Sequence, residues 1–200
     1  MNKQPILCAI DIETSGPNII KNGILSIGIC AGTVTGNIIV RRRIDVKLHR
    51  SKSFDTNTWD NFWCKNKKIL EIIQEHPLEE SAAVIEFINV IDDLEDNYKV
   101  IIISDNPVFD IGFLNYYLAF YINRLPLQYD KEGVFRPIYD TDSYTRGVLR
   151  KNYNNIYTDD KEIIKKLNIE LPQLDSSKKH LPEYDAEYIY HLHRMILIKS

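Results

Sequence analysis

Acidic and apolar side chains alternate in the segment Ala9-Ile-Asp-Ile-Glu-Thr-Ser-Gly16. Asp11 and Glu13 are two positions apart, and on a β-strand residues at that spacing point to the same side of the sheet. Two carboxylates less than about 7 Å apart repel each other unless a cation lies between them, and hard oxygen ligands suit Mg²⁺ or Mn²⁺. The pair alone leaves two interpretations open, because acidic residues also end strands as solvated groups.

Two later segments share one layout, in which a proline is followed by two residues and then an aspartate. They are Asn106-Pro-Val-Phe-Asp110 and Leu181-Pro-Glu-Tyr-Asp185. Proline is tolerated at the first helical position, so the layout predicts two helix starts. Asp110 and Asp185 would then lie in first turns, where the helix dipole favours an anion. His180 lies on the loop that enters the second helix, in the position of a general base.

Five residues therefore have types and spacing suited to metal-dependent hydrolysis: Asp11, Glu13, Asp110, His180 and Asp185. Their order, and the His-x-x-x-x-Asp spacing of the last two, resemble the DEDDh exonucleases, which are named for four acidic residues and a histidine. The match spans nearly the whole chain. A sister group has tyrosine four residues before the last aspartate, where this chain has Leu181. The histidine subclass is therefore the better match.

The resemblance implies the fold, the cofactors and the reaction. The fold would be α/β and ribonuclease-H-like, with three α/β/α layers and a mixed five-stranded sheet. The activity would be two-metal-dependent 3′-to-5′ hydrolysis of DNA or RNA, as single strands or short oligonucleotides, releasing nucleoside 5′-monophosphates. The cofactors would be two Mg²⁺ or Mn²⁺ ions.

The resemblance also implies a role for each of the five residues. Asp11 would bridge both ions, Glu13 and Asp185 would complete the site of the attacking water, and Asp110 would hold the second ion. His180 would take the proton of the water, and an imidazole that titrates near pH 6.5 suits that step at neutral pH.

Substrate contacts are implied less directly. Family comparison suggests that the backbone and side chains of Ile12, Thr14 and Ser15 contact the terminal nucleotide. Asn106 is either a further substrate contact or the cap of the following helix.

A looser resemblance concerns Thr58-Trp-Asp-Asn-Phe-Trp-Cys-Lys65, which looks like the tryptophan-bearing helix of phage-type exonuclease A and related stand-alone exoribonucleases. Trp59 and Trp63 are four positions apart, so on an α-helix they would share a face and could stack on a terminal base. The alternative is that both rings belong to the core.

The order of predicted elements agrees with this fold. Strands are expected near 6–12, 24–31, 37–47, 100–103 and 134–139, and helices near 58–75, 79–96, from Asp110 onward, 141–150, 160–167 and 183–198. The apolar run Val100-Ile-Ile-Ile103 is typical of a strand that is covered on both faces. We expect the polar loop near 171–181, which carries His180, to be mobile without substrate.

Composition bounds the remaining possibilities. With 200 residues, 44% of them hydrophobic, the chain is expected to form one domain over residues 1–200. It lacks an apolar run of about 18–20 residues and a secretory signal, so we expect a soluble intracellular protein without a membrane partner. Frequent Ile, Asn, Lys and Tyr are typical of an AT-rich genome, such as that of a large virus or phage.

A net charge of −3 is unusual for a nucleic-acid enzyme. Two divalent cations in the cleft would offset this negative charge at the place where the substrate phosphate binds. Three widely spaced cysteines suggest neither a disulfide framework nor a zinc site.

Two other functions stay open. One is a nucleic-acid-binding or partner-docking module of the same fold without catalysis, although all five residue types are present. The other is an endonuclease that uses the same metals. Relatives in the family are often dimers, so a homodimer is an additional expectation.

Overall fold

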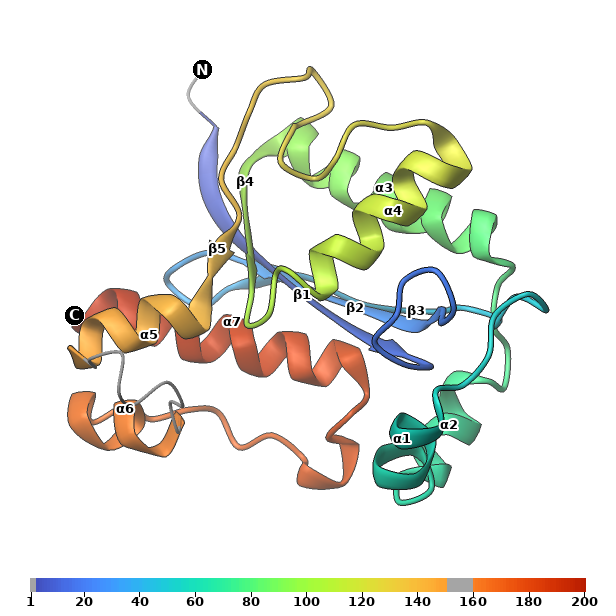
Figure 1. Cartoon of the computed structure of the whole chain (residues 1–200). Coiled ribbons are helices and arrows are strands. Elements are labelled where there is room, and N and C mark those ends of the chain that lie inside the picture. Colours follow the sequence, from blue (N-terminus) through green and yellow to red (C-terminus); the bar gives the residue numbers. More distant parts are fainter. Residues whose placement is uncertain (1–2, 151–159) are drawn as a thin grey trace.

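The computed structural model describes residues 3–150 and 160–200 (Figure 1). A mixed five-stranded sheet, ordered β3-β2-β1-β4-β5, lies between two layers of helices. Its strands are β1 (Gln4–Thr14), β2 (Ile24–Gly32), β3 (Ile38–Asp45), β4 (Tyr98–Ser104) and β5 (Tyr139–Asp140). β1 to β3 form an antiparallel meander, and β4 runs parallel to β1 on its other side. The predicted ribonuclease-H-like α/β/α architecture is confirmed.

The side chains of the central strand β1 point alternately to the two faces of the sheet and so belong to two separate core clusters. Its residues Ile6, Cys8, Ile10 and Ile12 pack with α3 (Glu80–Asn97) and α4 (Asp110–Ile122). Leu7 and Ala9 pack on the opposite face against α7 (Pro182–Lys199). The helices α5 (Thr141–Leu149) and α6 (Asp160–Leu167) lie beside α7 in the same layer. Because residues two apart on a strand share a face, Asp11 and Glu13 lie on the α7 side, as predicted.

The predicted continuous helix near 58–75 is wrong. The segment forms α1 (Thr56–Thr58), a π-helical turn at Trp59–Trp63, and α2 (Lys67–Ile73) after a break. The Cys64 amide donates to the Trp59 carbonyl, five residues back, at 2.9 Å. The two tryptophans that flank this wider turn lie in different environments. The side chain of Trp63 is 0% exposed, whereas that of Trp59 is 36% exposed.

The fifth strand is also shorter than predicted. β5 contains only Tyr139 and Asp140, which pair in parallel with Ile103 and Ser104 at the end of β4. Pro137 lacks an amide hydrogen and therefore cannot continue a ladder between strands. The residues before it form an irregular loop, closed by an isolated bridge between Tyr129 and Phe135.

Within the described part of the chain, each helix is too short or too polar to cross a bilayer.

Candidate active site

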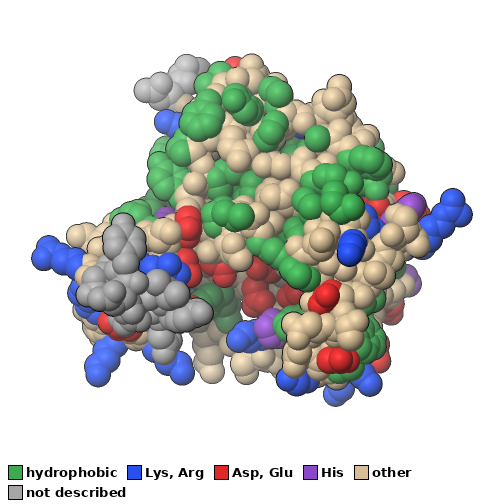
Figure 2. Space-filling view, viewed as in Figure 1, with side chains coloured by type: hydrophobic (Ala, Val, Ile, Leu, Met, Phe, Trp, Pro, Cys, Tyr) green, Lys and Arg blue, Asp and Glu red, His purple; other side chains and the backbone are tan. Residues whose placement is uncertain are grey.

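Three elements of the fold bring the five predicted residues to one place. Asp11 and Glu13 come from β1, Asp110 begins α4, and Asp185 lies in the first turn of α7, directly after the loop of His180. The predicted positions of Asp110 and Asp185 in first helical turns are confirmed. Figure 2 shows acidic side chains in a hollow at the middle of this face. The hollow is a cleft of about 740 Å³.

A glycine allows α7 to begin close to the sheet. Gly28 on β2 pairs with Asp11 across the β1–β2 ladder. A Cβ at Gly28 would lie 2.0 Å from the carbonyl of Pro182, the first residue of α7. Only a glycine permits this approach, which carries Asp185 towards the carboxylates of β1.

The ligand-type side chains form two groups. Ligand atoms of Glu13, His180 and Asp185 lie within 4.8 Å of one another, and so do those of Asp11, Asp105 and Asp110. Asp105 was not among the predicted residues. Its signal in the sequence was an acidic residue directly after the apolar strand β4, the same signal that marked Asp11 and Glu13.

The carboxylates raise the pKa of one another. Burial, and then the charge of Glu13, raise the pKa of Asp11, while burial followed by Asp185 raises that of Glu13. Burial raises the pKa of Asp110 to about 7, although a 2.5 Å hydrogen bond from the Ser104 hydroxyl opposes the shift. A divalent cation would relieve this repulsion, and a set of carboxylate oxygens suits Mg²⁺ or Mn²⁺. The residues present therefore fit the expected ions.

His180 is held against both carboxylates of its group. Its backbone amide donates to Asp185 Oδ2 at 2.9 Å. Its ring Nδ1 lies 3.8 Å from Asp185 Oδ2 and 3.9 Å from Glu13 Oε1. The backbone at His180 has a φ of 71°, in the left-handed region. Burial and the charge of Lys179 lower the pKa of His180, which favours the neutral ring that can accept a proton.

Residues near His180 contact the edge strand β3 of the sheet. The ring of Tyr184 lies between two cations, because Arg41 of β3 sits 3.9 Å above its centroid and Lys178 Nζ donates to its hydroxyl at 2.6 Å. Arg41 also pairs with Glu187 of α7 at 3.1 Å. These contacts join Lys178 of the loop, and Arg41 of β3, to α7. The mobility of the loop without substrate stays a prediction.

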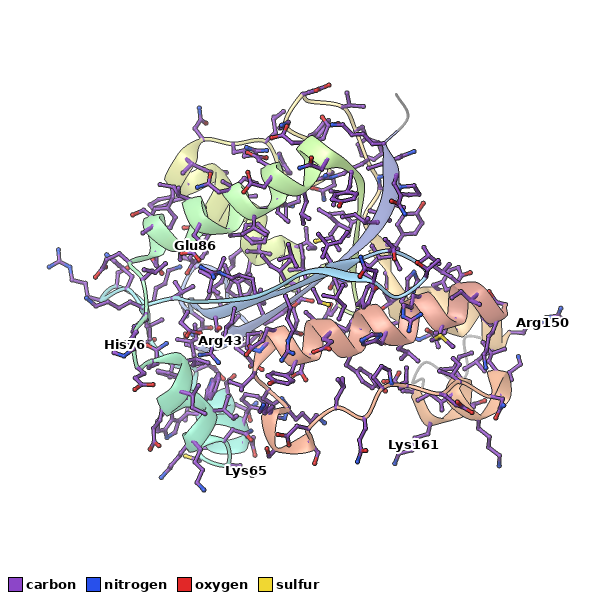
Figure 3. The ribbon with its side chains drawn as sticks, turned by 180° about the vertical axis from the view of Figure 1, so that it is seen from behind. Arg43, Lys65, His76, Glu86, Arg150 and Lys161 are labelled. Carbon is purple, nitrogen blue, oxygen red and sulfur yellow. The ribbon has the colours of Figure 1, made fainter. Side chains whose placement is uncertain are left out.

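A second arginine of β3 reinforces the same contact with α7. Arg43 pairs with Glu183 at 3.3 Å and lies between β3 and the start of α7 when the molecule is seen from behind (Figure 3). The two arginines thus join the edge of the sheet to the helix that carries Asp185.

None of the five residues predicted to contact substrate is among those that line the cleft. The side chain of Ile12 is in the core, on the opposite face of the sheet from Asp11. Ser15 is fully buried, and its hydroxyl donates to the Ser53 carbonyl at 2.9 Å. Thr14 donates to the Gly16 carbonyl at 3.0 Å. The prediction is therefore corrected for the three side chains, because two of them bind within the turn at the end of β1 and the third lies in the core. Contact of their backbone with a nucleotide stays a prediction.

Asn106 is exposed, and its side chain does not cap α4. Its main-chain carbonyl instead accepts from the Asp110 amide at 2.9 Å. Its contact with substrate stays a prediction.

Trp63 belongs to the core, which is the alternative that the sequence left open. It is completely buried, packs with Leu25 and Leu181, and its indole N–H donates to the Thr14 carbonyl at 2.9 Å. A ring that is covered on both faces cannot stack on a base. The aromatic side chain of this segment that does line the cleft is Phe62, whose ring meets that of His180 edge-on at 4.8 Å. Sequence analysis missed Phe62, although it lies between the two tryptophans.

We expect Trp63→Ala to destabilise the protein by about 3–5 kcal/mol, because the change leaves a cavity in the core and an unpaired carbonyl at Thr14. Urea denaturation measures the loss. Trp59→Ala, at a ring that is 36% exposed, is the matched control and should cost much less. A Trp63→Ala protein of normal stability with a raised KM would contradict the core assignment.

Among the comparisons with known proteins, the one with solved structures finds similar folds. No protein-family model matches the sequence, and no curated protein matches it. Among solved structures, the nuclease domain of 3′hExo, a DEDDh family member, bound to rAMP, has a TM-score of 0.68 at 13% identity, with 98% of this chain and 92% of that one covered. E. coli Exonuclease I in complex with a dT13 oligonucleotide has a TM-score of 0.67 at 15% identity, with 98% and 42% covered.

A full-length 3′-exonuclease has a TM-score of 0.68 at 12% identity, with 99% of this chain and 62% of that one covered. The chain thus spans less than two thirds of Exonuclease I and of this exonuclease. At such identities the likeness establishes the fold alone. The chain has the mixed α/β fold of these exonucleases, and its acidic groups lie at the ends of the elements that build that fold.

Proposed function

We propose that this protein is a two-metal 3′-to-5′ exonuclease acting on DNA or RNA. The observation that carries the proposal is a pair of ligand groups, Glu13 with His180 and Asp185, and Asp11 with Asp105 and Asp110. Five of these six residues, all but Asp110, line one cleft. Structural neighbours that are exonucleases support it, including one bound to rAMP and one bound to an oligonucleotide. A structure of E. coli ExoI with single-stranded DNA and a zinc ion supports the use of divalent metals.

Each of the two groups would hold one metal ion. Glu13 and Asp185 would hold one ion beside His180, and Asp110 with Asp105 would hold the other, with Asp11 completing the second group and reaching towards the first. Bound Mg²⁺ or Mn²⁺ would lower the pKa of the attacking water and stabilise the leaving oxygen. His180 would accept the proton of that water, and the ring nitrogen that faces Glu13 and Asp185 is Nδ1. The hydrogen bond from the His180 backbone amide to Asp185 Oδ2 keeps the ring beside the carboxylates.

The walls of the cleft suit a nucleotide. Phe62 offers an aromatic edge beside His180, and Lys179 brings a positive charge to the same cleft. The finer likeness to phage-type exonuclease A stays part of the proposal, with Phe62 in place of a tryptophan at the cleft. A homodimer also stays a prediction, which the molar mass in solution would test.

The test is digestion of matched single-stranded DNA and RNA labelled at the 5′ end, with Mg²⁺, Mn²⁺ or chelator. A ladder that shortens from the 3′ end only with metal is expected, and the faster of the two substrates identifies the preferred sugar. A closed circular strand should stay intact. Cutting of the circle would instead assign an endonuclease, and the absence of any cleavage would favour a binding module.

A further inference from the structure

A second groove lies on the other side of the turn that carries Asp105. It has a volume of about 450 Å³ and lies between the start of α4 and the irregular loop before β5. Its lining includes Pro107, Val108, Ile111, Gly112, Phe135 and Pro137. Among the described residues, no charged side chain lines this groove. Figure 2 shows hydrophobic side chains next to the acidic hollow on this face.

Large apolar side chains stand exposed at the groove. Val108 is 89% exposed, and Phe135 is 65% exposed. The Phe135 ring is supported from one side by Tyr129, which meets it edge-on at 5.8 Å. Exposed apolar side chains that gather at a groove are typical of a binding surface.

The floor of the groove contains a glycine that packing in the chain does not explain. Gly112 lies inside α4, where glycine is destabilising relative to alanine. A Cβ at this position would meet no atom of the described chain within 4 Å. The backbone of α4 is therefore accessible to a ligand in the groove.

We propose that this groove holds a nucleobase of the substrate strand, from a nucleotide on the 5′ side of the scissile phosphate. This inference rests on the proposed exonuclease function. The turn from Asp105 to Phe109 is the wall that the groove shares with the active site, because Asp105 lines the cleft while Pro107 and Val108 line the groove. A strand whose scissile phosphate lies in the cleft beside Asp105 would pass this turn, and a neighbouring base would then lie at the groove.

The chemistry of the lining selects a base rather than a phosphate or a charged peptide. An uncharged apolar groove does not attract phosphate, whereas every base has a flat face that packs on aromatic and aliphatic side chains. Recognition should be tolerant of sequence, because both polar atoms of the Asn115 amide in the lining bind within the chain. Asn115 Nδ2 donates to Gln128 Oε1 at 3.0 Å, and Asn115 Oδ1 accepts from the Leu127 amide at 2.8 Å.

One consequence concerns the form of the substrate. A base can enter the groove only when it is unpaired and unstacked from its neighbours. The protein should therefore degrade single strands and 3′ overhangs faster than blunt duplexes.

The test uses a protein variant whose new side chain fills the groove and, separately, a substrate that lacks one base. Gly112→Leu places a side chain in the groove without removing a contact, and it should keep or raise the melting temperature. Gly147→Leu is the matched control, since Gly147 is also a helical glycine whose Cβ would meet no described atom within 4 Å, but it lies on α5. Both variants and the wild type are assayed on oligonucleotides that are intact or carry one abasic nucleotide at the second or third position from the 3′ end.

In the wild type, one of the abasic substitutions should raise KM about tenfold or more, as expected for losing one stacked base. Gly112→Leu should raise KM for the intact strand to a similar extent and no longer distinguish it from the abasic one, whereas Gly147→Leu should behave as the wild type. Phe135→Ala should change KM in the same direction as Gly112→Leu.

Equal KM values for all proteins and strands, with normal shortening from the 3′ end, would overturn the groove assignment and leave the exonuclease standing. If only Gly112→Leu changed the molar mass in solution, the groove would belong to contact with a second copy of the chain. A wild type without exonuclease activity would overturn both proposals.

Discussion

Asp11→Asn is expected to abolish metal-dependent shortening of nucleic acid, with a loss in kcat of at least about 10³-fold. Asp11 is the acidic residue whose neighbours include Glu13, Asp105, Asp110 and Asp185, so its removal weakens both proposed ion sites. The fold should be retained, because the asparagine has nearly the same shape as the carboxylic acid. Asp60→Asn, which removes an exposed carboxylate from the turn at Trp59–Trp63, is the matched control and should leave kcat unchanged.

The same variant should be more stable than the wild type when metal is absent. Burial and neighbouring carboxylates raise the pKa of Asp11 and Glu13, and burial raises that of Asp110 to about 7. Groups with raised pKa keep their protons in the folded state after the unfolded chain has released its own near pH 4. Their contribution to stability is therefore complete at low pH and is lost as pH rises through the folded-state pKa values.

Melting temperatures in chelator, from pH 5 to pH 8, measure this effect. The wild type should lose stability as pH rises, Asp11→Asn should lose less, and the difference should widen towards pH 8. Mg²⁺ should restore the wild type more than the variant. Parallel pH profiles for the two proteins would show that Asp11 does not take part in the buried charge repulsion.

His180→Ala is expected to lower kcat by about 10²–10⁴-fold while metal binding is retained. The reason is that the neutral ring lies beside Glu13 and Asp185, where it can take a proton from water. Burial and Lys179 lower the pKa of His180, so the wild-type rate should rise with pH and level off below the ordinary histidine range near 6.5. The variant should lose this limb of the profile.

Metal binding distinguishes a base from a ligand. His180 lies close enough to Glu13 and Asp185 to share an ion with them. If His180→Ala abolished the rise in melting temperature that Mn²⁺ gives the wild type, the histidine would be a ligand. The variant His49→Ala, at an exposed histidine outside both ligand groups, serves as the control.

The positions of the five residues followed from local rules. Alternation on a strand put Asp11 and Glu13 on one face, and Pro182 at the start of α7 put Asp185 in its first turn. Asp110 is the first residue of α4, and Pro107 precedes that helix by three residues instead of beginning it. These rules depend on residues that are near one another in the chain. The prediction of one helix near 58–75 was wrong because a contact between distant residues decides the structure there. Its π-helical turn places the Trp63 indole against the carbonyl of Thr14, which is far away in the sequence.

The sequence by itself determined the strand and helix ends at which the acidic residues lie, because backbone periodicity, proline and helix dipoles act within a few positions. Only the tertiary structure decided what surrounds them. It brought Asp105 to Asp11, placed Phe62 rather than Trp63 at the cleft, and joined Arg41 to Tyr184 and α7. These contacts link segments that are distant in the chain, so burial and packing select them only when the whole sheet and its helices are assembled.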